Sequence, residues 1–256
     1  MRAAFFKPLL LALALALASG PLGAQPTPPV SRPDASAALQ KQDTGVFMAR
    51  HESFLARARG GPIGLLFLGD SITERWQRAP HIWQAYFGQY QPANFGIGGD
   101  RTQHLLWRIE QGELDGIAPK VVVLMIGTNN SHDYNAGEIA AADRKIVALI
   151  RARLPQTRIL LLGIFPRGPR PDKAGAVTQA AIDDAARRKL TIDAVNRELA
   201  GLDDGKMVRF LDLGAVFLGQ DGRIPWSIMP DQLHPAPAGY QLWADAMQPL
   251  LEAMMK

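Results

Sequence analysis

The chain has 256 residues, of which 47% are hydrophobic and 20% are charged, and it contains no cysteine. This composition is that of an ordinary globular protein with one sizeable core, and it excludes disulfides, thiol nucleophiles and thiolate metal sites. The formal net charge is only +4, and no run of lysine or arginine with interleaved aromatic residues occurs, so nucleic acid is not an expected partner. Catalysis by such a chain would use hydroxyl, imidazole or carboxylate groups.

The N-terminus has the pattern of a secretory signal peptide. Arg2 and Lys7 flank its short first part, and the apolar run at 9–18 is too short to anchor the chain stably in a bilayer. We expect residues 1–24 to be removed, with a cut near 18–20 as the alternative, and hence a secreted or periplasmic protein without a stable membrane anchor. An uncleaved anchor is the competing interpretation.

Residues 25–41 are rich in proline, serine, threonine and alanine, which predicts a linker outside the core. A single folded domain is expected over residues 42–256. Its first helix is predicted at 42–59, on the outside of the domain. His51 lies there among polar neighbours, which indicates a solvated surface histidine.

An apolar run at 63–68 predicts a buried parallel strand, because it lacks the alternation of a strand with one solvent-exposed face. The run ends at Gly69 and Asp70, and Ser71 opens the next helix. Open α/β sheets bind ligands at the carboxyl ends of their strands, so Ser71 is a candidate nucleophile. The alternative is a purely structural serine, since Ser71 and Glu74 have the spacing of a helix-capping box.

A helix is expected at 81–87 and a strand at 90–95, and a glycine-rich sequence follows the strand. Gly96, Gly98 and Gly99 permit a close backbone approach that a β-carbon would block. Their spacing does not fit the dinucleotide fingerprint G-x-G-x-x-G, and no acidic ribose partner is evident. A nucleotide cofactor is therefore not expected.

The rest of the chain alternates between strands and helices. The run 121–126 is the clearest strand, continuous and β-branched, and is expected at the centre of the sheet. Asn129 follows it as another polar residue at a strand end, with simple turn formation as the alternative. Further strands are predicted at 158–164 and 207–213, and further helices at 102–110, 136–153, 178–200 and 236–254. Five strands joined by helical crossovers predict a three-layer α/β/α sandwich with a parallel sheet.

The last polar motif is Asp231 and His234, in a turn flanked by prolines. Their spacing can place both side chains on one side of a turn, where His234 could take the proton of Ser71 and Asp231 could orient the imidazole. No G-x-S-x-G elbow surrounds Ser71, which argues against the α/β-hydrolase fold. The alternative is a metal site, but it needs further ligands, and nothing places His104 or His132 near this pair.

Four sequence blocks resemble those of the SGNH/GDSL hydrolase family: Gly69-Asp70-Ser71, Gly99, Asn129 and Asp231-x-x-His234. The stretch 94–130 is especially similar to the catalytic alpha subunits of type 1B platelet-activating-factor acetylhydrolases, and the similarity covers about residues 64–250. The resemblance implies a flavodoxin-like fold and serine esterase activity without a cofactor or metal. It also implies a catalytic triad of Ser71, Asp231 and His234, and an oxyanion hole. The implied donors of that hole are the backbone N–H groups of Ser71 and Gly99 and the side-chain amide of Asn129.

The resemblance also bears on the substrate. Leu233 matches a leucine that helps to bound a small acyl pocket in those subunits, which favours short acyl groups. Trp226, Ile228 and Met229 are candidates to line the entrance, with core packing as the alternative. The related subunits are intracellular, so their phospholipid substrate is not transferred to a chain with a leader.

The resulting hypothesis is an exported serine esterase that hydrolyses acetyl or other short-chain esters of small molecules, carbohydrates among them. Two alternatives stay open: a lysophospholipase or thioesterase with a longer acyl pocket, and a non-catalytic carbohydrate-binding module on the same fold. The sequence leaves the oligomeric state open, with a homodimer as one option.

Overall fold

The computed structural model describes residues 32–43 and 45–256, and one compact unit spans residues 33–256. The predicted signal peptide, residues 1–24, lies outside the described residues. In the described part, the strands form one parallel sheet in the order β2-β1-β3-β4-β5. The strands are β1 (Leu65–Gly69), β2 (Pro92–Gly96), β3 (Val121–Met125), β4 (Arg158–Leu162) and β5 (Val208–Leu211). The helices are α1 (Val46–Arg59), α2 (Ser71–Glu74), α3 (Pro80–Phe87), α4 (Thr102–Arg108), α5 (Ala136–Arg153), α6 (Gln179–Ala200) and α7 (Pro237–Met255).

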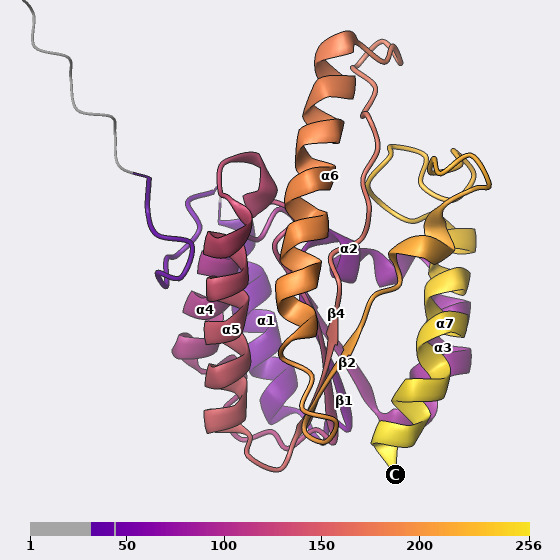
Figure 1. The fold of residues 1–256 in the computed structure, drawn as a ribbon. Helices are drawn as coiled ribbons and strands as arrows, with labels where there is room; N and C mark the ends of the chain where they lie inside the picture. The colour runs from indigo at the N-terminus through magenta and orange to yellow at the C-terminus, as the bar shows by residue number, and fades with distance from the viewer. Residues whose placement is uncertain (1–31, 44) are drawn as a thin grey trace, which may run out of the picture. The chain divides into compact units, whose positions relative to one another are not determined.

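Helices cover both faces of the sheet, which confirms the predicted α/β/α sandwich (Figure 1). Helices α1, α4, α5 and α6 pack against one face, and α2, α3 and α7 pack against the other. Each face of the sheet has its own cluster of buried apolar side chains. Because side chains alternate along a strand, Leu66 belongs to the cluster on the side of α1, α4, α5 and α6, and its neighbour Phe67 to the cluster on the side of α2, α3 and α7. Both are completely buried, as expected for a strand covered on both faces. Among the helices of the described residues, none has the length and apolar character needed to cross a membrane.

The predicted elements are all present, and the strand ends differ from the prediction by no more than two residues. The largest difference is at α1, which begins at Val46 and not at residue 42. Gly45 has a φ of 93°, and this left-handed conformation cannot belong to the interior of a right-handed helix. The glycine therefore sets the start of α1.

The three neighbouring strands β2, β1 and β3 end at the same level, because Gly69 pairs with Gly96 on one side and with Met125 on the other. The connections from β1 and β3 lead to opposite halves of the sheet, which makes this edge a topological switch point, where open parallel sheets bind ligands. The segments that leave these strands, residues 70–71, 97–100 and 126–130, therefore start from one edge of the sheet.

Residues 33–41, here named the N-terminal strap, pack on the domain. They are the last part of the predicted linker over 25–41, of which residues 25–31 lie outside the described residues. Ala35 is buried, and its carbonyl accepts a hydrogen bond from the Thr102 hydroxyl at 2.7 Å. The compact unit accordingly begins at Pro33. Proline content did not reveal this docking, because the partners of the strap include residues of α4 and α5, far along the chain.

Candidate active site

Ser71 lies where the sequence predicted, directly after β1 and at the first position of α2. The strand end before it is closely packed: a β-carbon at Gly69 would lie 2.2 Å from the Thr73 hydroxyl oxygen and 2.5 Å from the Met125 carbonyl oxygen. Only glycine therefore fits at this strand end without a shift of its neighbours. Ser71 is itself buried, with 8% of its surface exposed, so its hydroxyl lies at a shielded edge of the sheet.

The cap of α2 is Asp70 and not Ser71. The Asp70 Oδ1 accepts a hydrogen bond from the Ile72 N–H at 2.9 Å, so the capping-box alternative for Ser71 and Glu74 is wrong. Glu74 lies instead 3.3 Å from the guanidinium of Arg50. Because capping falls to Asp70, the serine hydroxyl is left for a different partner.

A continuous chain of hydrogen bonds joins Ser71, His234 and Asp231. The Ser71 Oγ lies 2.8 Å from His234 Nε2, and His234 Nδ1 lies 2.6 Å from Asp231 Oδ2. The other carboxylate oxygen, Oδ1, accepts the backbone N–H of His234 at 2.8 Å, so the turn itself fixes the carboxylate. A neutral imidazole that donates Nδ1–H to Asp231 presents its Nε2 lone pair to the serine hydroxyl. This is the geometry that a general base needs to remove the proton of a hydroxyl.

The carboxylate of Asp231 is held in its charged form. Partial burial opposes the charge, but hydrogen bonds from the ring and backbone of His234, together with the charge of Arg170, keep the pKa of Asp231 well below its ordinary value. The Arg170 Nη2 lies 3.0 Å from Asp231 Oδ2, and Arg75 approaches the same oxygen to 3.8 Å. An ionised Asp231 can stabilise the imidazolium that forms when His234 takes a proton.

Residues 97–100, here named the glycine turn, lie beside Ser71. The N–H of the last residue donates to the carbonyl of the first at 3.1 Å, and Gly99 has a φ of 74°, which is the pattern of a type II β-turn. A β-carbon at Gly98 would lie 3.9 Å from the β-carbon of Ser71. The turn therefore brings the peptide between Gly98 and Gly99 next to the serine.

Asn129 follows β3 and faces the same turn. Its Nδ2 donates to the Asp100 carbonyl at 2.8 Å and lies 3.4 Å from Asp70 Oδ2. The structure thus brings Ser71, Gly99 and Asn129, the residues of the predicted oxyanion hole, to one sheet edge. A tetrahedral intermediate carries a full negative charge on oxygen, and N–H groups fixed in advance at such an edge can stabilise it.

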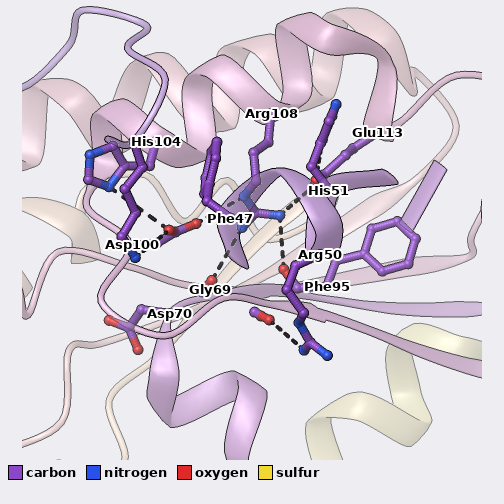
Figure 2. Close-up of polar contacts among 12 residues, drawn as sticks. Phe47, Arg50, His51, Gly69, Asp70, Phe95, Asp100, His104, Arg108 and Glu113 are labelled. Carbon is purple, nitrogen blue, oxygen red and sulfur yellow. Dashed lines mark hydrogen bonds and ion pairs between the residues drawn. The ribbon is translucent and has the colours of Figure 1, made fainter. Parts of the chain in front are cut away.

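A cluster of buried charges supports the glycine turn, and the sequence analysis missed it (Figure 2). Arg108 of α4 is completely buried, and it donates to Asp100 Oδ2 at 2.9 Å and to Glu113 Oε2 at 2.5 Å. The same guanidinium donates to the carbonyl oxygens of Phe95 at 3.0 Å and Gly69 at 3.3 Å. One side chain therefore links the ends of β1 and β2 to the glycine turn.

His51 belongs to this cluster, and its predicted place on the solvated surface is wrong. The residue is 3% exposed, and its Nδ1 lies 2.9 Å from Glu113 Oε1. Polar neighbours in the sequence do not show that α1 directs this side chain inward. The available signal was Arg108, which follows Leu105 by three residues and therefore lies on the buried face of α4. A buried arginine requires carboxylate partners, and their presence indicates a polar cluster inside the domain.

Two buried carboxyl groups near Ser71 resist ionisation. Burial raises the pKa of Asp70 to about 7 against the hydrogen bond from the Ile72 N–H, and the charge of Asp100 acts in the same direction as burial. Burial also raises the pKa of Asp100 to about 6, although Arg108 and Lys41 favour its charged form. Both carboxyl groups therefore titrate near neutral pH, beside the residues of the predicted oxyanion hole.

Leu233, a predicted substrate contact, is buried next to His234. It is 4% exposed and belongs to the same apolar cluster as Ile72, the residue after Ser71. Of the entrance candidates, Met229 is completely buried in this cluster and Ile228 packs against it. The core-packing alternative therefore describes Ile228 and Met229.

A cavity of about 760 Å³ lies beside the turn that carries Asp231 and His234. Gln232, the residue after Asp231, lines it, and so does Trp226, the other predicted substrate contact, which is 52% exposed. Arg167 lines the cavity too, with its Nη1 3.4 Å from the Thr128 carbonyl oxygen. The cavity thus offers an exposed indole and a guanidinium close to the strand end that carries Asn129.

No group of three or more histidine, aspartate or glutamate side chains within residues 32–43 and 45–256 is arranged to hold a metal ion. The His104 Nδ1 accepts the Arg101 N–H at 3.0 Å, and His132 contacts the carboxylate of Asp133. Neither histidine joins the turn that carries His234. The metal alternative therefore finds no further ligand among the histidines considered for it.

Comparison with known proteins confirms the resemblance. Residues 67–242 match the model of the GDSL-like lipase/acylhydrolase family. Platelet-activating factor acetylhydrolase IB subunit alpha1 from Bos taurus is 35% identical over 210 residues, which cover 82% of this chain and 84% of the relative. Subunit alpha2 from Rattus norvegicus is 36% identical over 228 residues, which cover 89% and 91%. Among solved structures, a GDSL-like lipase from Bacteroides thetaiotaomicron shares the fold with a TM-score of 0.61 at 18% identity, covering 80% of this chain and 98% of its own. The chain therefore belongs to the GDSL-like lipase/acylhydrolase family and is an ester hydrolase.

Proposed function

We propose that this protein is a serine esterase that removes short acyl groups, acetyl above all, through an acyl-enzyme intermediate. The observation that carries the proposal is the hydrogen-bond chain from Ser71 through His234 to Asp231, with distances of 2.8 Å and 2.6 Å. It supports Ser71 as the nucleophile, His234 as the general base, and Asp231 as the carboxylate that orients the imidazole.

In the proposed reaction, the Ser71 Oγ attacks the ester carbonyl carbon while His234 Nε2 takes the hydroxyl proton. The carbonyl oxygen becomes an oxyanion, which accepts hydrogen bonds from the N–H groups of Ser71 and Gly99 and from the Asn129 amide; losing one such donor costs about 2.7–4 kcal/mol of barrier. When the intermediate collapses, His234 gives the proton to the departing alcohol. Water then repeats the sequence on the acyl-enzyme, which releases the acid and restores Ser71.

Two observations support a short acyl group. Leu233 directly precedes His234, and Ile72 directly follows Ser71. Both apolar side chains are buried in one cluster, so they occupy space beside the catalytic pair that a long acyl chain would need. Both named relatives are acetylhydrolase subunits, which makes acetyl the first acyl group to test.

The cavity beside Gln232 is the proposed site of the alcohol part of the ester. Its lining combines the exposed indole of Trp226 with the charged side chain of Arg167, which suits a polar alcohol such as an acetylated carbohydrate. A second candidate follows from the same cavity. Val177 and Ile182 give it a partly exposed apolar wall, which could receive the longer acyl chain of a lysophospholipase or thioesterase substrate.

Export is also part of the proposal, and the signal pattern of residues 1–24 supports it. We expect the protein recovered from the periplasm or the medium to have the mass of a chain that starts at Gln25. Recovery of the full-length chain from the cytoplasm alone would contradict export.

The test of the activity is hydrolysis of p-nitrophenyl esters from acetate to octanoate by the purified mature protein and by Ser71→Ala. We expect acetate to be preferred, and Ser71→Ala to lower kcat on the order of 10⁴–10⁶-fold. A fluorophosphonate should label only the protein that retains Ser71. Preference for octanoate would support the longer-chain candidate, and equal rates in both proteins would overturn Ser71 as the nucleophile. Glycan binding without hydrolysis or labelling would instead support a carbohydrate-binding module.

A further inference from the structure

Lys41, the last residue of the N-terminal strap, contacts the glycine turn. Its ammonium donates a hydrogen bond to the Gly98 carbonyl oxygen and lies 3.6 Å from Asp100 Oδ1. The lysine side chain is 19% exposed, so the contact is largely shielded from water. The Asp100 Oδ1 is buried and accepts no hydrogen bond from the part of the chain that the structure describes, which makes the nearby positive charge electrostatically favourable.

The strap fixes the position of Lys41. The Leu39 N–H donates to the Gln103 carbonyl at 3.1 Å, and the Thr102 hydroxyl donates to the Ala35 carbonyl at 2.7 Å. Thr102 and Gln103 both belong to the first turn of α4, which begins just after the glycine turn. The strap and the glycine turn therefore share one support, and Lys41 approaches the turn from a defined direction.

The peptide that Lys41 contacts is the one proposed to stabilise the oxyanion. The Gly98 carbonyl and the Gly99 N–H belong to one planar trans peptide, in which they point in opposite directions. Because Lys41 binds the carbonyl, the N–H is directed away from the lysine. Rotating this peptide by half a turn would convert a type II into a type I turn and reverse both groups. Glycine on both sides lowers the steric barrier to that rotation, and the hydrogen bond to Lys41 opposes it.

The positive charge also strengthens the donor. Hydrogen bonds polarise one another when they share a peptide group, and charge-assisted hydrogen bonds are about twice as strong as neutral ones. An ammonium at the Gly98 oxygen draws electron density through the peptide from the Gly99 nitrogen. The Gly99 N–H thereby becomes a better donor to a negatively charged oxygen.

We propose that Lys41 is a positioning residue for the esterase reaction, holding and polarising the peptide between Gly98 and Gly99 so that the Gly99 N–H meets the oxyanion. This inference rests on the proposed function, in which that N–H stabilises the tetrahedral intermediate. Negative charge develops on the substrate oxygen only in the transition state, so Lys41 acts on the chemical step and not on substrate binding.

The test measures kcat and KM for p-nitrophenyl acetate in Lys41→Met and Lys41→Arg. The methionine retains an unbranched stem without the charge, and we expect kcat to fall about 10–30-fold, which is less than the 10²–10³-fold effect of removing a whole donor. We expect KM to stay within about twofold. The arginine restores a cationic donor and should bring kcat back to within about threefold of the wild type.

Lys145→Met is the matched control. Lys145 donates to the Ser36 carbonyl at 2.8 Å, so it fastens the same strap by the same kind of bond but does not contact the glycine turn. We expect its kcat to equal that of the wild type within about twofold. An equal loss in Lys145→Met and Lys41→Met would overturn the proposal, because docking of the strap alone would then explain it. A loss confined to KM, or unchanged kcat in Lys41→Met, would overturn it too.

Thermal unfolding of each variant shows whether it is folded, and Lys41→Gln replaces Lys41→Met if the methionine variant is not. Ser71→Ala, assayed alongside, separates this proposal from the one on which it rests. If Ser71→Ala is as active as the wild type, the proposed function fails. If Ser71→Ala is inactive and Lys41→Met is fully active, only the role of Lys41 fails.

Discussion

Two arginine–aspartate pairs flank Ser71, the proposed nucleophile, and they differ mainly in burial. Arg108 lies 2.9 Å from Asp100, and both side chains are completely buried. Arg170 lies 3.0 Å from Asp231, but these side chains are 47% and 33% exposed. The distances are nearly equal, so distance does not rank the pairs. Water screens the exposed pair, whereas removal of one partner from the buried pair leaves a charge that water cannot reach.

The comparison separates the base side of the site from the donor side. On the base side, Asp231 and His234 lie in a turn that is partly open to water. On the donor side, the glycine turn rests on the buried cluster around Arg108 (Figure 2), and Asn129 bonds to that turn. Donors that are fixed in advance need no reorganisation when charge develops, which is how such groups lower a barrier. The rigid support is thus concentrated where the oxyanion is proposed to form.

The largest effect is expected from Arg108→Met. This change leaves Asp100 and Glu113 buried without their common cation, and we expect the free energy of unfolding to fall by about 3–5 kcal/mol. Urea denaturation measures the loss, with Arg170→Met as the matched control on the exposed pair. Equal losses in the two variants would contradict the distinction between the donor side and the base side.

A smaller, pH-dependent effect is expected from Asp70→Asn. Because the pKa of Asp70 is raised to about 7, its contribution to stability is complete below the unfolded pKa of about 3.9 and is lost as the pH rises through 7. Asparagine cannot ionise, yet its side-chain oxygen can still accept the Ile72 N–H. The stability of Asp70→Asn relative to the wild type should therefore increase from pH 5 to pH 8 by about 2.6 kcal/mol.

Urea denaturation at both pH values checks this prediction. His104, whose pKa is lowered to about 4 by burial and by nearby cations, changes stability in the opposite direction in the wild type and in Asp70→Asn alike. Its contribution therefore cancels in the difference between the two proteins. If the free energies of unfolding of the wild type and of Asp70→Asn change with pH in parallel, then Asp70 ionises at its ordinary pKa in the folded protein, and the prediction is wrong.

The smallest effect is expected from Arg170→Gln. The exposed pair contributes about 1 kcal/mol or less, so the free energy of unfolding should change little and kcat should fall by less than about fivefold. The Asp231 carboxylate keeps its hydrogen bonds from His234 in this variant. Ester hydrolysis and urea denaturation, each at low and at high salt, measure these two effects. High salt should reduce the difference between the variant and the wild type further. A hundredfold fall in kcat would mean that Arg170 does more than pair with the Asp231 carboxylate.

The sequence by itself determined the elements of the fold and the order of the site residues. The run that became β3 marks a strand buried on both faces, because burial of this kind selects apolar residue types along a short stretch. Ser71 and Asn129 each follow such a strand, so their place at one sheet edge was predictable from strand order. The place of His234 beside Ser71 was predictable from the resemblance of the motifs.

Only the tertiary structure decided which charges meet. His51 and Glu113 lie 62 positions apart, and Lys41 lies 57 positions from Gly98. The strap that carries Lys41 had the composition of a linker, and the partners that dock it are distant in the chain. Periodicity is a local property of the sequence, whereas the burial and pairing of charges depend on how separate elements pack. For this reason the order of the candidate site residues was predictable, and the buried cluster around Arg108 was not.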